Sequence, residues 1–210
     1  SPGLKGFGTR KNGRYYGSYH FGKYIDNRTT IKNASSETRS NITNFSHMDY
    51  MGNGNGELYS WYWKGYFVAH EAGNYRFATE SDDDSFVWLD GKNVVNNGGL
   101  HGKHKNEGSI EYLKQGEIKV IEITFSENHG GDNMIFQWYN TTIHNDWIQE
   151  AVWNSKTYFY QTVTKNTITP ELKKPIWRFS NGSYYTEIES GTKDIVMDSI
   201  KINGKGISIL

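Results

Sequence analysis

The sequence contains no cysteine, and this absence excludes two kinds of structure. The chain has no disulfide framework, and it has no metal site built from thiolates. A domain of about 200 residues buries enough surface to be stable without disulfides, so an extracellular location remains compatible with the composition. Only three prolines occur, and no internal repeat or low-complexity linker interrupts the chain.

An excess of charge of either sign is also missing. The 23 lysines and arginines balance 23 aspartates and glutamates, so the formal net charge is zero. Proteins that bind nucleic acids normally carry a basic excess, and general attachment to anionic membranes needs one too. No apolar run approaches the roughly 20 residues of a membrane-spanning helix. We therefore expect neither a nucleic-acid partner nor insertion into a membrane.

Aromatic residues and glycine are abundant instead. Aromatic residues make up 15% of the chain, with 15 tyrosines and seven tryptophans, and there are 23 glycines. This composition favours strands and tight turns over helices. The length of 210 residues suits one all-β domain, since such domains often run to about 200–250 residues.

Short strand-like segments follow one another at regular spacing, separated by turn residues. In residues 118–125, Ile121, Ile123 and Phe125 alternate with polar residues and are expected to share the core face. Asp90-Gly91 is the strongest hairpin signal, and residues 146–153 are typical of a short helix. Strands are predicted over residues 57–69 (as one or two strands), 75–79, 86–89, 110–113, 118–125 and 134–138.

This spacing predicts an all-β fold, a sandwich or a barrel of antiparallel strands. We expect a single domain over residues 1–210. Its central segment is residues 57–138, and residues 1–56 and 139–210 are strand-like extensions packed on that segment. Residues 175–177, 183–185 and 200–209 are each expected to add a strand. A separate second domain of about 70 residues at the C-terminal end is the alternative.

Asp82, Asp83 and Asp84 form an acidic triplet between two predicted strands. Adjacent carboxylates repel one another, and they are costly to hold near a core without a cation. In a loop between strands their oxygens can converge on a hard ion such as calcium, which takes six to eight oxygen ligands. From the triplet alone, a solvated acidic turn is the simpler interpretation, and a calcium site is the alternative.

A second loop, residues 126–133, is also rich in oxygen donors. Glu127, Asn128, Asp132 and Asn133 offer side-chain oxygens, and the two glycines free backbone carbonyls to turn toward an ion. If this loop lies at the same end of the sandwich as the triplet, the two together complete an oxygen cage.

Catalytic motifs are not found. The sequence has no nucleophile elbow, no phosphate-binding glycine loop and no zinc-protease helix. Asp82 and Glu127 have no spacing that supports a glycosidase pair. His101 and His104 lack a third zinc ligand nearby, which makes zinc a weak interpretation. We therefore predict no catalytic residues and no enzyme activity.

Four motifs in residues 62–95 carry a family resemblance. They are Trp63-Lys-Gly65, Gly73-Asn-Tyr-Arg-Phe77, Asp82-Asp83 and Val87-Trp-Leu-Asp-Gly91. This pattern resembles the PA14 domain shared by anthrax protective antigen, many glycosidases and yeast flocculins. Gly98-Gly-Leu-His101, and Phe125 followed by Glu127 and His129, are similar to the fibro-slime variant of that domain. The resemblance covers residues 57–138 and is absent after about residue 140.

The resemblance implies an antiparallel β-sandwich of the protective-antigen type with a calcium site. The family's lectins bind calcium through two consecutive aspartates joined by a cis peptide, which correspond to Asp82 and Asp83. A second loop supplies an asparagine side chain and backbone carbonyls, for which Asn128, His129 and Gly131 are the nearest matches. Sugar hydroxyls complete the coordination. The flocculins' cysteines are missing here, and the second loop reads Glu-Asn-His-Gly-Gly-Asp rather than theirs.

The implied function is a calcium-dependent carbohydrate-binding (lectin) domain of a secreted or cell-surface adhesin, in which a sugar diol coordinates calcium directly. Its partners are glycans on cell surfaces or glycoproteins, and the unit is expected to be a monomeric domain within a larger protein. The alternative is a structural or ancillary module of a larger secreted toxin or hydrolase, without sugar affinity. The expected sugar contacts are Asp82, Asp83, Asn128, Asp132, His101 and Trp88.

Overall fold

The computed structural model describes residues 1–19, 23–46, 49–51, 56–163, 199–202 and 205–208. The chain divides into two compact units, Ser1–Thr162 and Val163–Leu210. In the second unit, β14 (Ser199–Ile202) and β15 (Lys205–Ser208) form an antiparallel hairpin. The strands expected at 175–177 and 183–185 lie outside the described residues. The placement of the C-terminal segment on the sandwich stays a prediction.

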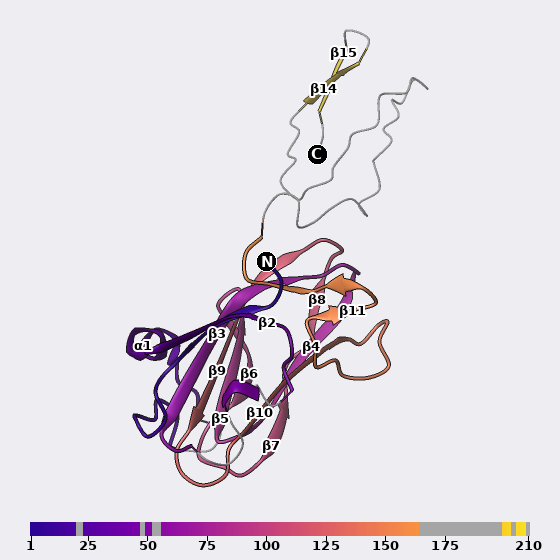
Figure 1. Cartoon of the computed structure of the whole chain (residues 1–210). Coiled ribbons are helices and arrows are strands. Elements are labelled where there is room, and N and C mark those ends of the chain that lie inside the picture. The colour runs from indigo at the N-terminus through magenta and orange to yellow at the C-terminus, as the bar shows by residue number, and fades with distance from the viewer. Residues whose placement is uncertain (20–22, 47–48, 52–55, 164–198, 203–204, 209–210) are drawn as a thin grey trace. The chain divides into compact units, whose positions relative to one another are not determined.

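The first unit consists of two antiparallel β-sheets packed as a sandwich, which confirms the predicted fold class (Figure 1). The larger sheet has seven strands in the order β2-β1-β3-β9-β5-β6, with β13 also paired to β3. The smaller sheet has the order β10-β4-β7, with β8 also paired to β4. The strands of the larger sheet are β1 (Leu4–Gly8), β2 (Glu37–Ile42), β3 (Tyr59–Val68), β5 (Asp84–Leu89), β6 (Lys92–Asn97), β9 (Ile118–Glu127) and β13 (Phe159–Tyr160). Those of the smaller sheet are β4 (Gly73–Asp82), β7 (His104–Glu107), β8 (Glu111–Leu113) and β10 (Asn133–Asn140).

Aromatic side chains fill the space between the sheets. Alternate residues of β3 point inward, and the fully buried Phe67 packs its ring against Tyr75 and Phe77 of β4 at centroid distances of 5.1 and 5.2 Å. Trp138 of β10 contacts the same ring at 5.5 Å. Burying one such side chain contributes about 2 kcal/mol, so this cluster holds the two sheets together. Ile121, Ile123 and Phe125 are fully buried, as their alternation predicted.

The N-terminal extension is part of the larger sheet, because β1 pairs with both β2 and β3. The end of the first unit returns to the same place. Pro2 bridges Tyr160, and the backbone N–H of Gly3 donates to the carbonyl of Phe159 over 2.8 Å. The two ends of the first unit therefore lie side by side.

The predicted helix at 146–153 is wrong. Ile148 instead forms a β-bridge with Trp138, and the carbonyl of Gln149 accepts from the N–H of Phe45, so neighbouring strands hold this backbone in an extended form. The segment continues into a small hairpin, β11 (Val152–Trp153) and β12 (Lys156–Thr157). The α-helix lies elsewhere: α1 (Arg28–Ala34) packs beside β1 and β3, and a short 3-10 turn, η1, spans Asp49–Met51.

The predicted hairpin at Asp90-Gly91 is confirmed. It joins β5 to β6, and both residues have positive φ angles of 47° and 80°, as a tight two-residue hairpin of this type requires.

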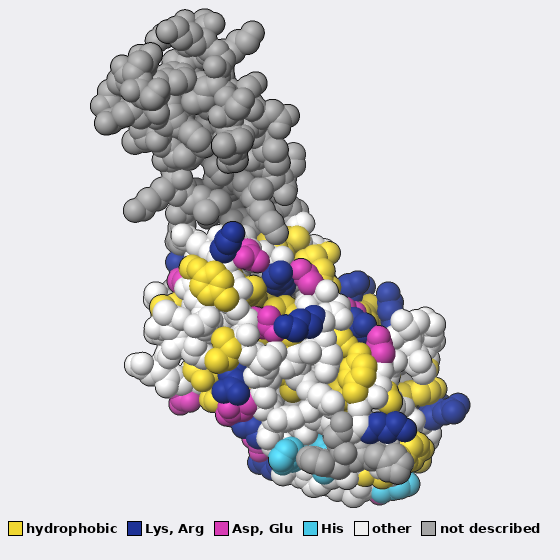
Figure 2. Space-filling model, turned by 180° about the vertical axis from the view of Figure 1, so that it is seen from behind, with side chains coloured by type: hydrophobic (Ala, Val, Ile, Leu, Met, Phe, Trp, Pro, Cys, Tyr) yellow, Lys and Arg dark blue, Asp and Glu magenta, His cyan; other side chains and the backbone are white. Residues whose placement is uncertain are grey.

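Charged residues of both signs are interspersed over the face of the first unit that Figure 2 shows, in a chain whose formal net charge is zero. Many are paired: Arg76 lies 2.9 Å from Glu107, and Lys92 lies 2.8 Å from Glu111. Within the described part of the chain, no helix is long and apolar enough to cross a bilayer.

Two connections between the sheets lie at the same end of the sandwich. The chain passes from β4 in the smaller sheet to β5 in the larger one at Asp83, and it returns from β9 to β10 through residues 128–132. Asp82 is the register partner of Asn133, and Asp84 is the register partner of Ser126. The acidic triplet and the second oxygen-rich loop are therefore neighbours, which the sequence alone did not establish.

Candidate cation-binding site

Asp82 and Asp83 lie where the chain crosses between the sheets. Asp82 is the last residue of β4 and Asp84 the first of β5, so only Asp83 separates the two strands. The peptide bond between Asp82 and Asp83 is cis, as the family resemblance implied. Both carboxylates are thus placed at the edge of the core by two strands that pair independently with β10 and β9.

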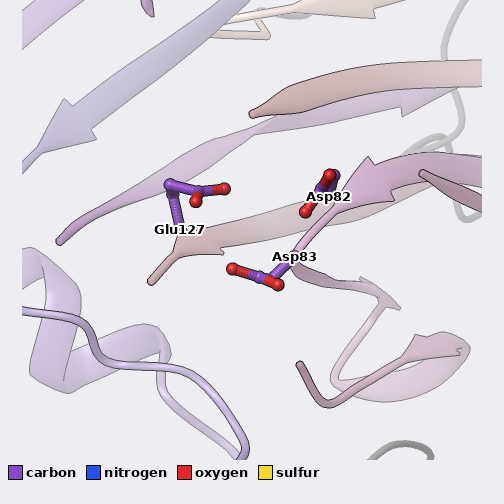
Figure 3. A group of neighbouring side chains, drawn as sticks. All are labelled: Asp82, Asp83 and Glu127. Atoms are coloured by element: carbon purple, nitrogen blue, oxygen red, sulfur yellow. The ribbon is translucent and has the colours of Figure 1, made fainter. Parts of the chain in front are cut away.

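A third carboxylate joins this pair. Asp82, Asp83 and Glu127 each place an oxygen within 4.8 Å of the others, and Figure 3 shows the three side chains around one space. Asp83 is 5% exposed and Glu127 is fully buried, while Asp82 is partly open to solvent. Among the described residues, neither carboxylate oxygen of Glu127 has a hydrogen-bond partner of normal geometry. We refer to Asp82, Asp83 and Glu127 as the carboxylate cluster.

The electrostatics of the carboxylate cluster favour an added positive charge. Burial, together with the charges of Asp83 and Asp82, raises the pKa of Glu127 to about 9. Burial and the charge of Asp83 raise the pKa of Asp82 to about 6, and burial also raises the pKa of Asp83. Such a group must either take up protons or bind a cation. The buried oxygens of Glu127, which lack a hydrogen-bond partner of normal geometry, and the carboxylates beside them fit a hard cation such as calcium.

The second loop reaches the carboxylate cluster through its backbone. The N–H of Asn128 donates to Asp83 Oδ2 over 2.9 Å, and the carbonyl of Asn128 accepts from the N–H of Leu58. Gly131 lies beside Asp82, since a Cβ on this glycine would stand 3.6 Å from Asp82 Oδ2. Asn128 and Gly131 therefore lie beside the carboxylate cluster, and their role as calcium ligands stays a prediction.

The remaining two residues predicted in this loop have other contacts. The ring of His129 is exposed, and its Nδ1 lies 2.9 Å from Glu57 Oε2. Asp132 accepts a hydrogen bond from the hydroxyl of Tyr59 over 2.5 Å. The negative charge of Asp132 nevertheless raises the pKa values of Asp82 and Glu127, so this carboxylate belongs to the same electrostatic environment.

A third loop, between β6 and β7, borders Asp83. The backbone N–H of His101 donates to Asp83 Oδ1 over 3.2 Å, and the His101 Nε2 lies 3.1 Å from the carbonyl oxygen of Asn97. The rings of His101 and His104 are 5.6 Å apart at their centroids. Over the described residues, no third metal-ligating side chain joins these two histidines. His101 is thus at the rim of the carboxylate cluster, where the sequence placed it.

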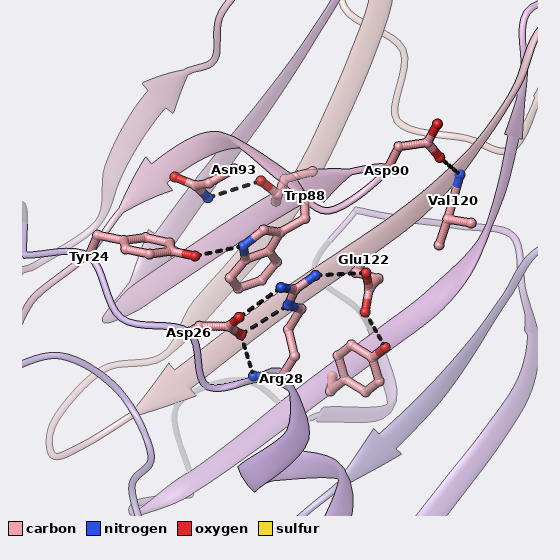
Figure 4. Close-up of polar contacts among 10 residues, drawn as sticks. Tyr24, Asp26, Arg28, Trp88, Asp90, Asn93, Val120 and Glu122 are labelled. Atoms are coloured by element: carbon pink, nitrogen blue, oxygen red, sulfur yellow. Dashed lines mark hydrogen bonds and ion pairs between the residues drawn. The ribbon is translucent and has the colours of Figure 1, made fainter.

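Trp88 is not available to a sugar. Its side chain is fully buried, its indole N–H donates to the hydroxyl of Tyr24 over 3.0 Å, and the guanidinium of Arg28 lies 4.6 Å from a ring centroid (Figure 4). An aromatic ring stacks on a sugar only through an exposed face, and Trp88 has none. We therefore omit Trp88 from the proposed sugar-binding residues.

The third aspartate of the triplet has a separate role. Asp84 is 1% exposed and accepts a hydrogen bond at Oδ2 from the backbone N–H of Ser18. Gly17 packs directly on this carboxylate, because a Cβ at residue 17 would lie 2.1 Å from Asp84 Oδ1. Burial raises the pKa of Asp84 to about 8. Asp84 anchors an N-terminal loop, and only Asp82 and Asp83 face the cluster.

Glu127 is the site residue that sequence reasoning missed as a metal ligand, although its oxygens were noted. The signal was present in the alternation of β9. Ile121, Ile123 and Phe125 point into the core, and Glu127 continues the same face by two residues. A carboxylate at the end of an inward-facing row is costly to bury unless a partner or an ion is there.

Comparisons with known proteins assign the family. The family model described as the PA14 domain matches residues 10–151, more than half of the chain. The chain belongs to the PA14 domain family. This finding confirms the resemblance drawn from Trp63-Lys-Gly65, the aspartate pair and the hairpin motif. A comparison with curated protein sequences gave no significant match.

Solved structures of PA14 domains and of an adhesin share the fold. The PA14 domain of the MpAFP antifreeze protein is 13% identical, with a TM-score of 0.57 over 76% of this chain and 90% of that one. The epithelial adhesin 6 A domain from Candida glabrata, in complex with Galb1-3GlcNAc, is 15% identical, with a TM-score of 0.54 over 79% and 89%. An anti-sigma factor domain-containing protein is 15% identical, with a TM-score of 0.56, and this chain covers 49% of it.

Proposed function

We propose that this chain is a calcium-dependent carbohydrate-binding domain of a secreted or cell-surface adhesin. The observation that carries the proposal is the carboxylate cluster, in which the two oxygens of Glu127 are buried beside Asp82 and Asp83 without hydrogen-bond partners among the described residues. Membership in the PA14 family, and a fold shared with an adhesin domain solved with a bound disaccharide, support this proposal.

Different residues would bind the ion, orient its ligands and contact the sugar. Asp82, Asp83 and Glu127 would hold the ion, and the backbone N–H groups of Asn128 and His101 fix the orientation of the Asp83 carboxylate. Calcium, when bound, supplies open coordination positions for two neighbouring sugar hydroxyls. The partly exposed Asp82 leaves one side of the cluster accessible to them. Asn128, Asp132 and His101 lie on the surrounding loops and would contact the rest of the sugar.

A non-enzymatic role fits the burial of the cluster. A general acid must come within hydrogen-bond distance of the bond that it protonates. Glu127 has a strongly raised pKa, but its side chain is fully buried. Its raised pKa therefore serves ion binding in this proposal rather than proton transfer to a substrate. The partners are glycans, and the domain acts as a monomer within a larger protein.

A glycan array probed in calcium and again in chelator tests the proposal. We expect binding to sugars with vicinal hydroxyls in calcium, and its loss in chelator. The Asp82→Asn, Asp83→Asn double variant should lose both calcium and sugar binding in calorimetry. Asp146→Asn is a matched control, because Asp146 is an exposed aspartate outside the site. If the wild-type protein binds calcium but no glycan on the array, the alternative of an ancillary structural module replaces the proposal.

A further inference from the structure

A second polar pocket lies on the outer face of the larger sheet, beside α1. It has a volume of about 330 Å³ and is lined by Arg28, Thr29, Lys32, Asn33, Lys64 and Glu122, among others. Small-molecule sites usually have volumes of about 300–1,000 Å³. Glu122 and Glu127 are five residues apart on β9, and side chains of a strand alternate between its faces. This pocket and the carboxylate cluster therefore open on opposite faces of the sheet.

Both acidic groups of the pocket are held by the same guanidinium. Glu122 accepts a hydrogen bond at Oε2 from the hydroxyl of Tyr62 over 2.5 Å and forms an ion pair at Oε1 with Arg28 over 2.8 Å (Figure 4). Asp26 binds the same guanidinium at 2.7 Å. Arg28 in turn lies over the buried ring of Trp88. Asp26 and Glu122 share this one guanidinium, so the set keeps one formal negative charge, against the two positive charges of Lys32 and Lys64 in the pocket lining.

Three lysines around the pocket are left without ion-pair partners among the described residues. Lys64 is the register partner of Glu122, yet that carboxylate is taken by Arg28 and Tyr62. Lys5 stands opposite Lys64 on β1. Lys5 and Lys32 both approach the ring of Phe7, at 5.4 and 5.5 Å from its centroid. Like charges directly opposite on neighbouring strands destabilise a sheet, and an anion bound at Lys64, which lines the pocket, would reduce this repulsion.

We propose that this pocket binds an acidic sugar, with its carboxylate or sulfate group between Lys32 and Lys64. The argument is charge complementarity: the chain as a whole is neutral, but this pocket carries an unbalanced positive charge. The hydroxyl of Thr29 and the amide of Asn33, which also line the pocket, supply neutral hydrogen-bond partners for sugar hydroxyls. Binding here does not involve the carboxylate cluster, so it is independent of calcium.

Calorimetric titration in chelator and low salt tests this inference. The probes are trigalacturonate, a sulfated galactose disaccharide, neutral galactotriose and inorganic sulfate. We expect one or both acidic oligosaccharides to bind at least tenfold more tightly than galactotriose and inorganic sulfate. Affinity should fall as salt is added, because these charges are partly exposed. The Lys32→Ala, Lys64→Ala double variant should lose at least tenfold in affinity.

Lys114→Ala, at an exposed lysine directly after β8 of the smaller sheet, is the matched control and should bind like the wild type. Thermal unfolding should show that all variants are folded. The inference is overturned if neither acidic oligosaccharide binds, if the double variant binds as well as the control, or if inorganic sulfate binds equally well. Calcium-dependent binding on the glycan array should persist in the Lys32→Ala, Lys64→Ala double variant. Failure of the acidic-sugar proposal is therefore distinguished from failure of the calcium-dependent function.

Discussion

The backbone N–H of Asn128 donates to Asp83 Oδ2 over 2.9 Å, which ties the loop between β9 and β10 to the connection between β4 and β5. One carboxylate thereby joins two chain crossings that are 45 residues apart. A change at Asp83 alters the position of the second loop as well as the charge of the site. Substitutions at Asp83 alone therefore mix two effects, and Glu127 is the better residue for separating charge from loop geometry.

Glu127→Gln should weaken calcium binding without weakening the fold. The amide has the same shape but carries no charge, so the cation loses one anionic ligand while the burial cost of a carboxylate disappears. We expect at least a tenfold loss of calcium affinity, with a melting temperature in chelator equal to or above that of the wild type. Calorimetry and thermal unfolding measure the two quantities. Glu150→Gln, at an exposed position, is the control. Unchanged calcium affinity would place the ion elsewhere.

The stability of the cation-free protein should fall as the pH rises from about 5 to about 8. The pKa values of Asp82 and Glu127 are raised in the folded protein, to about 6 and about 9, above their usual range. The folded state therefore binds more protons than the unfolded chain at these pH values, and the free energy of unfolding decreases with pH. Melting temperatures in chelator, measured at each pH unit, should show this trend. A rising trend would contradict the raised pKa values.

Calcium affinity should show the opposite dependence on pH. The ion binds the deprotonated carboxylates, so binding releases protons and strengthens as the pH rises. Because burial and mutual repulsion raise the pKa values of the cluster, we expect affinity to decline already near pH 6, above the pH of about 4 at which isolated aspartates titrate. Calorimetry in two buffers of different ionisation enthalpy measures the released protons. An affinity that is constant from pH 5 to pH 8 would exclude these carboxylates as ligands.

Asp84→Ala should destabilise the protein while leaving calcium binding in place. The substitution removes the acceptor of the buried Ser18 N–H, and an unsatisfied buried donor costs about 1–3 kcal/mol. Asp84→Asn retains an acceptor oxygen and should cost less. Chemical denaturation gives the stability, and calorimetry gives the calcium affinity. Loss of calcium binding with unchanged stability would mean that all three aspartates face the ion.

Trp88→Phe should leave glycan binding unchanged and reduce stability. The substitution removes the indole N–H that donates to Tyr24 and leaves a smaller ring under Arg28. Losses of this kind cost about 1–2 kcal/mol. Glycan affinity should stay within twofold of wild type, because the side chain is fully buried. A large loss of glycan affinity in a stable variant would restore Trp88 as a sugar contact.

The sequence was sufficient for the parts of the fold that are determined locally. Alternation of Ile121, Ile123 and Phe125 predicted the inward face of β9, and Asp90-Gly91 predicted the hairpin between β5 and β6, because residue periodicity and positive φ angles act within a few residues. The helix at 28–34 and the extended backbone at Ile148 were missed. The latter depends on the bridge to Trp138, a tertiary contact that overrides local preference.

The site was also predicted only in part from the sequence. Asp82 and Asp83 were identified from their order in the chain, but the convergence with Glu127 required the register of β9 against β3 and β5. Trp88 was assigned to sugar on residue type, and only its contacts with Tyr24 and Arg28 show that it is enclosed. Burial is a property of the assembled sheets, and an aromatic residue in a strand does not reveal it.

The strand β3 runs from the place where the two ends of the first unit meet to the carboxylate cluster. Tyr66, near one end of β3, is paired with Tyr160, where the first and last strands of the unit meet, and Tyr59, at the other end, is paired with Glu127. The eight residues from Tyr59 to Tyr66 span about 23 Å at the rise of a β-strand. Both ends of this unit lie beside each other, remote from the carboxylate cluster. If the carboxylate cluster binds a ligand as proposed, the two ends of the first unit lie at the opposite end of β3 from that ligand.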